Sequence, residues 1–269
     1  MQSRRQMLSR SAKVASLLAA VGLLPGLAQA QAAGTFNAAA FSAKTMADLM
    51  KAVGGAAPTE SKDVTVTGPD IAENGAVVPV GAATSLPGVK RLLILVEKNP
   101  SMLTAMFDVT DAIDANILTR VKMGPVVKRL RRGDDERRQG AVRAEGSQGH
   151  TRRLRRLNKF QSKEITMADP MRIRAQVAGD KATVRVLMAH EMESGQRKDT
   201  AGKTIPAWHI QDVTAQHNGK TVMTAQWGPA VSKNPFMQFT VKGAKAGDKI
   251  TVSWVDNKGD KRSDEAVVS

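Results

Sequence analysis

Short apolar runs separated by turn residues dominate the sequence and indicate a mainly β fold. The clearest example is the pair Asn218-Gly219, which lies between the runs at 210–217 and 220–227. An Asn-Gly pair in this setting is typical of a two-residue hairpin turn, because both positions need a positive φ. The sequence predicts strands at residues 64–67, 76–80, 89–96, 105–109, 117–123, 172–177, 182–188, 210–217, 220–227, 235–241 and 249–255. Many short strands with turns between them are typical of antiparallel sandwiches.

One segment near the N-terminus has helical periodicity instead. Its apolar side chains recur at helical spacing and belong to Phe41, Met46, Leu49, Met50 and Val53. Two glycines at positions 54 and 55 follow and provide a stop signal. The sequence therefore predicts one amphipathic helix over residues 36–53.

The first thirty residues have the order of an export signal. Arg4 and Arg5 form a twin-arginine element with Leu8, and an apolar run follows at residues 14–24. The small residues Ala28 and Ala30 then form a cleavage site, so we expect the cut after Ala30. The apolar run is too short for a membrane anchor, which needs about 20 apolar residues. The sequence predicts delivery to the periplasm and no membrane span after cleavage.

A basic segment at residues 125–164 interrupts the strand pattern. It holds 13 Lys and Arg against 5 Asp and Glu. The difference, a net charge of +8, is more than half of the formal net charge of +15 of the whole chain. Clustered arginines attract phosphates, so one interpretation is an arm for nucleic acid or a membrane surface. The segment lacks interleaved aromatic residues and helical periodicity, which favours a basic linker and no nucleic-acid partner.

Few side chains suggest chemistry. The chain has no cysteine, which excludes disulfides, thiolate metal sites and a catalytic thiol. In a strand, Met188, His190 and Met192 would share one face, a spacing that could hold copper, although one histidine and two thioethers make an incomplete site. The sequence favours ordinary packing for these three, and it predicts no metal, no cofactor and no catalytic residue.

The remaining candidates also favour structural roles. We expect His209 and His217 to be structural or surface residues. The acidic run Asp134-Asp135-Glu136 lies among arginines and is interpreted as a solvated charge run. Trp227 and Trp254 are expected in the core or at an interface.

Two parts of the chain resemble SoxY and SoxZ, the two subunits of the carrier of the Sox sulfur-oxidation system. The leader, the helix at 40–53 and the stretch RLLILVEKNP at 91–100 resemble SoxY. The last hundred residues resemble SoxZ from MADPMRI at 167–173 onward. They include MAHEMESG at 188–195, WGPAVSKNP at 227–235 and WVDNKGD at 254–260.

SoxY proteins end in a mobile Gly-Gly-Cys-Gly-Gly arm whose cysteine holds the sulfur substrate, and the basic segment stands in its place here. One choice of codons for residues 149–158, read in the neighbouring frame, encodes Val-Thr-Leu-Gly-Gly-Cys-Gly-Gly followed by a stop. Our hypothesis is that the reading frame slipped near residues 123–125, passed the SoxY stop and joined the SoxZ frame. Met167 or Met171 would then be the original initiator of SoxZ.

The expected organisation follows from this resemblance. We expect a signal peptide at 1–30, a truncated SoxY-like domain at 36–124, an arginine-rich, misframed linker at 125–166 and a SoxZ-like domain at 167–269. The expected fold is mainly β, with two Ig-like antiparallel β-sandwich domains and an irregular basic linker. The SoxY-like part should be compromised by the loss of its last strands, whereas the SoxZ-like part should fold alone.

The resemblance implies a periplasmic, non-enzymatic carrier component of thiosulfate oxidation. Its two parts would pair within one molecule or between molecules and would bind other periplasmic Sox enzymes. Without a thiol, the chain should keep its binding surfaces but not carry sulfur. The alternative is a periplasmic two-domain binding or adapter protein whose basic linker captures an anionic partner.

Overall fold

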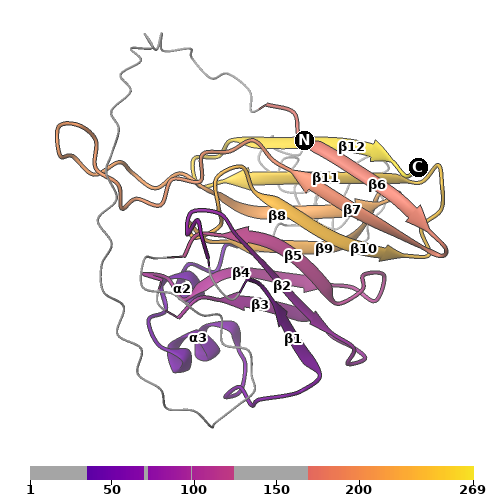
Figure 1. Ribbon diagram of the computed structural model, residues 1–269, viewed down its shortest axis with the longest axis horizontal. Helices are drawn as coiled ribbons and strands as arrows, with labels where there is room; N and C mark the ends of the chain where they lie inside the picture. The colour runs from indigo at the N-terminus through magenta and orange to yellow at the C-terminus, as the bar shows by residue number, and fades with distance from the viewer. Residues whose placement is uncertain (1–34, 70–71, 98, 124–168) are drawn as a thin grey trace, which may run out of the picture. The chain divides into compact units, whose positions relative to one another are not determined.

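The computed structural model describes residues 35–69, 72–97, 99–123 and 169–269 (Figure 1). The predicted signal peptide and the basic segment, including Asp134, Asp135 and Glu136, lie outside these residues. From Phe36 onward the described residues belong to one compact unit. We call residues 36–123 the N-terminal half and residues 169–269 the C-terminal half.

Two short helices replace the single helix that the sequence predicted. Helix α2 (Ala38–Ser42) ends where Ala43 takes an extended ψ of 134°. Helix α3 (Met46–Val53) begins anew because the side chain of Thr45 accepts a hydrogen bond from the Asp48 N–H, and it ends at Gly54 with a φ of 70°. The apolar periodicity is continuous across residues 36–53, but the helix is interrupted where Thr45 caps the start of α3.

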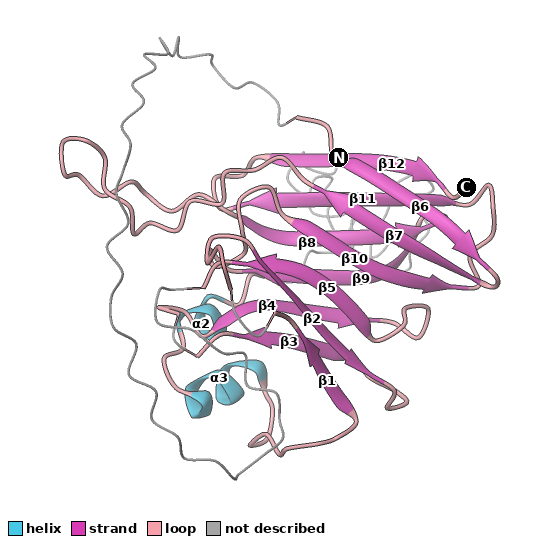
Figure 2. Cartoon of the chain, in the orientation of Figure 1, coloured by secondary structure: helices cyan, strands magenta, loops and turns pink. Residues whose placement is uncertain are grey.

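Twelve strands make up the rest of the described elements, and Figure 2 shows that strands outnumber helices. The N-terminal half contains β1 (Val64–Thr67), β2 (Val78–Thr84), β3 (Arg91–Leu95), β4 (Leu103–Val109) and β5 (Asn116–Val121). The C-terminal half contains β6 (Arg172–Ala178), β7 (Lys181–Leu187), β8 (Ile210–His217), β9 (Lys220–Trp227), β10 (Phe236–Lys242), β11 (Lys249–Asp256) and β12 (Lys261–Val267). The predicted mainly β, antiparallel fold is confirmed.

Each half contributes strands to both sheets. Sheet A has the order β1-β2-β5-β10-β7-β6, and sheet B has the order β12-β11-β8-β9-β4-β3. Every strand pairing among the described residues is antiparallel, and β5 joins β10 in sheet A while β4 joins β9 in sheet B. The two halves are therefore connected through main-chain hydrogen bonds in both layers.

The predicted hairpin and one unpredicted strand show what local sequence can reveal. Strands β8 and β9 are joined by Asn218 and Gly219, whose φ values are 48° and 79°, as the primed turn requires. Strand β12 was not predicted, because its sequence KRSDEAV has few apolar residues. It pairs with β11 over seven residues at the edge of sheet B, so its place is decided by its neighbour.

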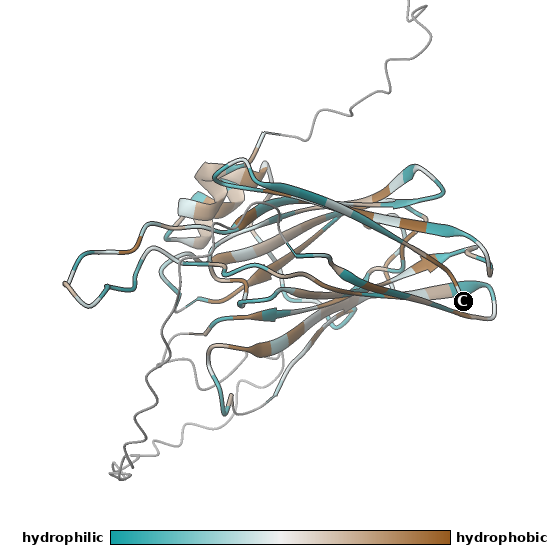
Figure 3. Cartoon of the chain, turned by 90° about the horizontal axis from the view of Figure 1, so that it is seen from above, coloured by the Kyte–Doolittle hydropathy of each residue, from teal (hydrophilic) through white to brown (hydrophobic). Residues whose placement is uncertain are grey.

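One hydrophobic core lies between the sheets and includes residues of both halves. Its largest fully buried side chains include Trp227, Trp254, Phe107 and Phe239. Both tryptophans were predicted to be in the core or at an interface, and both are buried. Figure 3 shows how hydrophobic and hydrophilic residues alternate along the strands, as expected when one face of a sheet is buried. A second, small cluster joins Phe41 and Leu49 of the helices to Leu103 and Met106 of β4.

Candidate functional site

The boundary between the two halves is bridged by strand pairing in both sheets. We call it the seam and define it by strands β4 and β5 on one side and β9 and β10 on the other. In sheet B, five residue pairs run from Ala105 opposite Trp227 to Val109 opposite Met223. In sheet A, Leu118 and Thr119 lie opposite Gln238 and Met237. The seam thus makes one half complete the sheets of the other.

Lys122 extends the seam beyond β5. Its main-chain N–H donates to the carbonyl oxygen of Ala230 at 2.6 Å. Its side-chain Nζ donates to the carbonyl oxygens of Met192 and Pro229, the latter at 3.0 Å. Burial lowers the pKa of Lys122 from its ordinary value of 10.5 to about 8, although the negative charge of Glu193 opposes this shift. One N-terminal side chain therefore binds two loops of the C-terminal half.

The N-terminal helical segment also contacts the C-terminal half. The Asn37 N–H donates to Oε1 of Gln226 at 3.0 Å, and Nε2 of Gln226 donates to Asp212 at 3.0 Å. Phe41 lies against Gly228, where an added Cβ would come within 2.8 Å of the Phe41 ring. Glycine at 228 is therefore what allows α2 to approach β9 closely.

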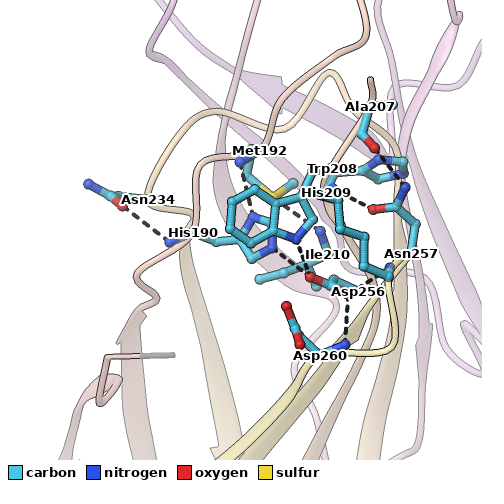
Figure 4. A network of polar contacts seen from close by, with 11 residues as sticks. His190, Met192, Ala207, Trp208, His209, Ile210, Asn234, Asp256, Asn257 and Asp260 are labelled. Atoms are coloured by element: carbon cyan, nitrogen blue, oxygen red, sulfur yellow. Dashed lines mark hydrogen bonds and ion pairs between the residues drawn. The ribbon is translucent and has the colours of Figure 1, made fainter. Parts of the chain in front are cut away.

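A buried polar network lies in the C-terminal half next to the loop that Lys122 contacts (Figure 4). Nδ1 of His190 accepts from the Met192 N–H at 3.0 Å, so Nε2 carries the proton and faces Asp256 Oδ2 at 3.2 Å. The same oxygen of Asp256 accepts from the indole N–H of Trp208. Its other oxygen accepts from the Lys258 and Asp260 N–H groups at 2.8 and 2.9 Å.

The charges in this network follow from burial and hydrogen bonding. Burial lowers the pKa of His190 and outweighs the opposing effect of Asp256. Burial alone would raise the pKa of Asp256, but the hydrogen bonds from His190, Trp208 and two main-chain N–H groups hold it below its ordinary value. The pair is thus a neutral histidine beside a carboxylate. Every polar atom of both side chains has a partner, which suits positioning of loops rather than proton transfer.

His209 lies close to this network but is different in kind. Its side chain is buried, and neither ring nitrogen has a hydrogen-bond partner among the described residues. Burial, followed by the nearby His190 and Lys122, lowers its pKa to about 4. The ring of Phe36 lies 6.4 Å away in an edge arrangement. His209 is therefore a neutral packing residue under the N-terminal segment.

The structure changes the interpretation of Met188, His190 and Met192. Strand β7 ends at Leu187, so the three residues lie in a loop and not on one strand face as the sequence suggested. Both methionines are buried, and Sδ of Met192 accepts from the Ile210 N–H at 3.3 Å. Because both ring nitrogens of His190 are bonded within the protein, this histidine offers no free lone pair to copper. His217 pairs with Asp248 at 2.8 Å.

Several residues of the site were not singled out from the sequence. They are Lys122, Asn37, Trp208, Asp256 and Asn257, whose side-chain oxygen accepts from the main-chain N–H of His209 at 2.8 Å. The run WVDNKGD could have indicated Asp256, since a carboxylate before Asn-Lys-Gly commonly accepts main-chain N–H groups of its own turn. No sequence signal marks Lys122, whose partners are 70 and 107 residues away. The export residues Arg4, Arg5, Leu8, Ala28 and Ala30 lie outside the described residues.

Within the described ranges, no helix is long and apolar enough to cross a membrane. The same part of the chain holds no group of three or more His, Cys, Asp or Glu side chains suited to a metal ion.

Comparisons with known families define the two halves. Residues 49–127 match the family of sulfur oxidation protein SoxY, and residues 171–267 match the family of sulphur oxidation protein SoxZ. Both matches lie in one chain, which is therefore a SoxY–SoxZ fusion of the sulfur-oxidation carrier type. The seam is the boundary between its SoxY segment and its SoxZ segment.

Other comparisons add little. No curated protein matches the chain. Among solved structures, a glycosyl hydrolase family 2 member from Bacteroides cellulosilyticus aligns with 75% of this chain at 10% identity and a TM-score of 0.20. The alignment covers 28% of that enzyme, and a similarity this weak carries no argument.

Proposed function

We propose that this protein is a periplasmic, non-enzymatic component of thiosulfate oxidation that binds partner Sox proteins through paired SoxY and SoxZ segments. The observation that supports it most is the seam, where two family segments complete each other's sheets within one chain. The proposed boundaries are a signal peptide at 1–30, a SoxY segment at 36–124, a linker at 125–166 and a SoxZ segment at 167–269.

The proposed role is binding rather than carrying sulfur. A thiolate on a flexible arm would be the nucleophile of a sulfur carrier, and this chain contains no cysteine. The seam does not depend on a thiol, since its contacts are main-chain hydrogen bonds, apolar packing and the lysine at position 122.

The test uses the purified mature chain and the periplasmic Sox enzymes encoded in the same genome. We expect surface plasmon resonance to show binding to at least one of these enzymes. We also expect the intact mass of the chain to be unchanged after incubation with that enzyme and thiosulfate. Absence of binding to all of them would refute the proposal, and a covalent sulfur adduct would refute the binding-only role.

Proteolytic removal of the linker separates this proposal from capture of an anion by the linker. Binding through surfaces that the paired SoxY and SoxZ segments form should survive removal of the linker. Binding through the basic segment should disappear when that segment is removed.

The origin of the fusion is a separate proposal about the gene. We propose that a single-base slip near residues 123–125 removed the cysteine arm. Sequencing genomic DNA from the codon of Ile117 to that of Met171 tests this. A gained or lost base would make two proteins of the locus, whereas an uninterrupted frame without the alternate cysteine codon would establish a true fusion without a thiol.

A further inference from the structure

The outer face of sheet A carries a basic patch that crosses the seam. We call it the arginine face and define it by Arg120, Arg172, Arg174, Arg185, Leu187 and Phe236. Cross-strand register places Arg172 opposite Leu187, and Leu187 opposite Phe236. The Arg120 guanidinium lies over the Phe236 ring at 4.8 Å from its centroid. The face therefore crosses β6, β7, β10 and β5, which lie side by side in Figure 1.

The arginines of this face have no carboxylate partner within the described residues. Arg174 lies directly opposite Arg185, whose Nε donates to the neutral Gln238 at 3.0 Å. Like charges in directly opposite positions destabilise a sheet. At the other end of the same face, Lys181 and Lys242 are both paired with Asp114, at 2.9 and 3.7 Å. A carboxylate thus balances the positive charges at the lysine end of the face, and among the described residues none does so at the arginine end.

The middle of the face is apolar. Phe236 and Leu187 are partly exposed between the arginines. An aromatic residue with surrounding arginines is the composition enriched at protein interfaces. A second copy of the chain would place arginines against arginines, so self-association is disfavoured by charge.

We propose that the arginine face is a docking surface for an acidic face of a partner protein. Charge complementarity would relieve the repulsion between Arg174 and Arg185 and would speed association. Arg120 comes from the SoxY segment and the other three arginines from the SoxZ segment, so the complete face exists only when the seam is formed. Partner binding would thereby be coupled to pairing of the segments.

The test measures binding of the full chain to poly-L-glutamate by calorimetry over a range of salt concentrations. The charge-reversal variant Arg174→Glu/Arg185→Glu is compared with Lys220→Glu/Lys261→Glu, which changes the same number of charges on sheet B. The basic segment contributes equally to both variants, so their difference reports on the arginine face. Equal melting temperatures show that both fold, and Arg174→Gln/Arg185→Gln gives an intermediate charge.

We expect the reversal on sheet A to weaken binding about tenfold or more and to reduce its salt dependence, with an intermediate loss for the glutamine variant. The control variant should stay within about twofold of the wild type. Hydrogen exchange should show protection of β6, β7 and β10 by poly-L-glutamate. Equal weakening by both reversals would overturn the proposal. The proposal would also be overturned if Arg174→Glu/Arg185→Glu lost binding to phosphatidylglycerol vesicles but bound poly-L-glutamate as the wild type does. The face would then recognise membranes.

Discussion

At the scale of single residues, the half-buried Lys122 and the buried His209 treat their side-chain nitrogen atoms in opposite ways. Lys122 uses its Nζ to satisfy two carbonyl oxygens across the seam. His209 has no partner for either ring nitrogen among the described residues and remains neutral. Both side chains have a pKa below its ordinary value because burial penalises the charged form. Their effects on stability therefore appear in different ranges of pH.

Lys122 should make the protein more stable as the pH rises above about 8. The folded state releases the lysine proton near pH 8, whereas the unfolded state holds it until about 10.5. Because the unfolded state binds more protons in this interval, the free energy of unfolding increases with pH. Urea unfolding at several pH values should show this slope in the wild type and a smaller slope in Lys122→Met. Identical slopes in the two proteins would contradict the assignment.

His209 should make the protein less stable as the pH falls from about 6.5 to about 4. The unfolded state gains a proton in this interval that the folded state does not accept. His209→Leu removes a side chain without hydrogen-bond partners, so it should match or exceed the wild-type stability at pH 7 and lose less of it in acid. Thermal melts at pH 7 and 4.5 measure both effects.

His217→Leu provides the matched control for this experiment. It deletes a histidine that is hydrogen-bonded to Asp248, so it should lose about 1 kcal/mol at pH 7. The assignment would be contradicted if His209→Leu were destabilised and His217→Leu were unaffected. In that case His209, and not His217, would be the histidine whose hydrogen bonds stabilise the fold.

At the scale of elements, the helices depend on β9 as much as on their own sequence. Thr45 and Gly54 delimit α3, but α2 has only five residues and packs beside Gly228. Short helices are marginal in isolation, so tertiary packing must hold α2 in place.

Gly228→Ala should therefore detach α2. The new Cβ would lie 2.8 Å from Cδ1 of Phe41, and overpacking of this kind costs about 1–3 kcal/mol. Hydrogen exchange should become faster at residues 36–45. The double variant Gly228→Ala/Phe41→Ala should show coupling, because removing the ring relieves the clash. Strictly additive losses would mean that the contact is not made.

The strand edges differ from the expectation for a truncated SoxY domain. Strand β5, the last described strand of the SoxY segment, is not an edge, because it pairs with β2 and β10. The edges at this end are β1 and β3, and in β1 Val64 and Val66 are 47% and 36% exposed. Strand β10 of the SoxZ segment thus pairs with β5, the strand at which loss of the last SoxY strands was expected to leave an exposed edge.

At the scale of the whole molecule, the seam predicts that the two segments stay together when the chain is cut. Limited proteolysis within the basic segment should give two fragments that separate on a denaturing gel but elute together in size-exclusion chromatography. Main-chain pairing in two sheets and a shared core oppose dissociation. Separate elution would contradict the seam. Folding of the SoxZ segment alone remains a prediction, and expression of residues 169–269 tests it.

The local sequence by itself determined eleven of the twelve described strands, the hairpin at Asn218-Gly219 and the similarity to SoxY and SoxZ. These features depend on residues close together in the chain, such as apolar alternation and turn preference. Only the tertiary structure decided that β4 pairs with β9 and β5 with β10, that β12 is a strand, and that Lys122 reaches Met192 and Pro229. Strand pairing and buried hydrogen bonds join residues far apart in sequence, and their free energy depends on register and burial that no local pattern encodes.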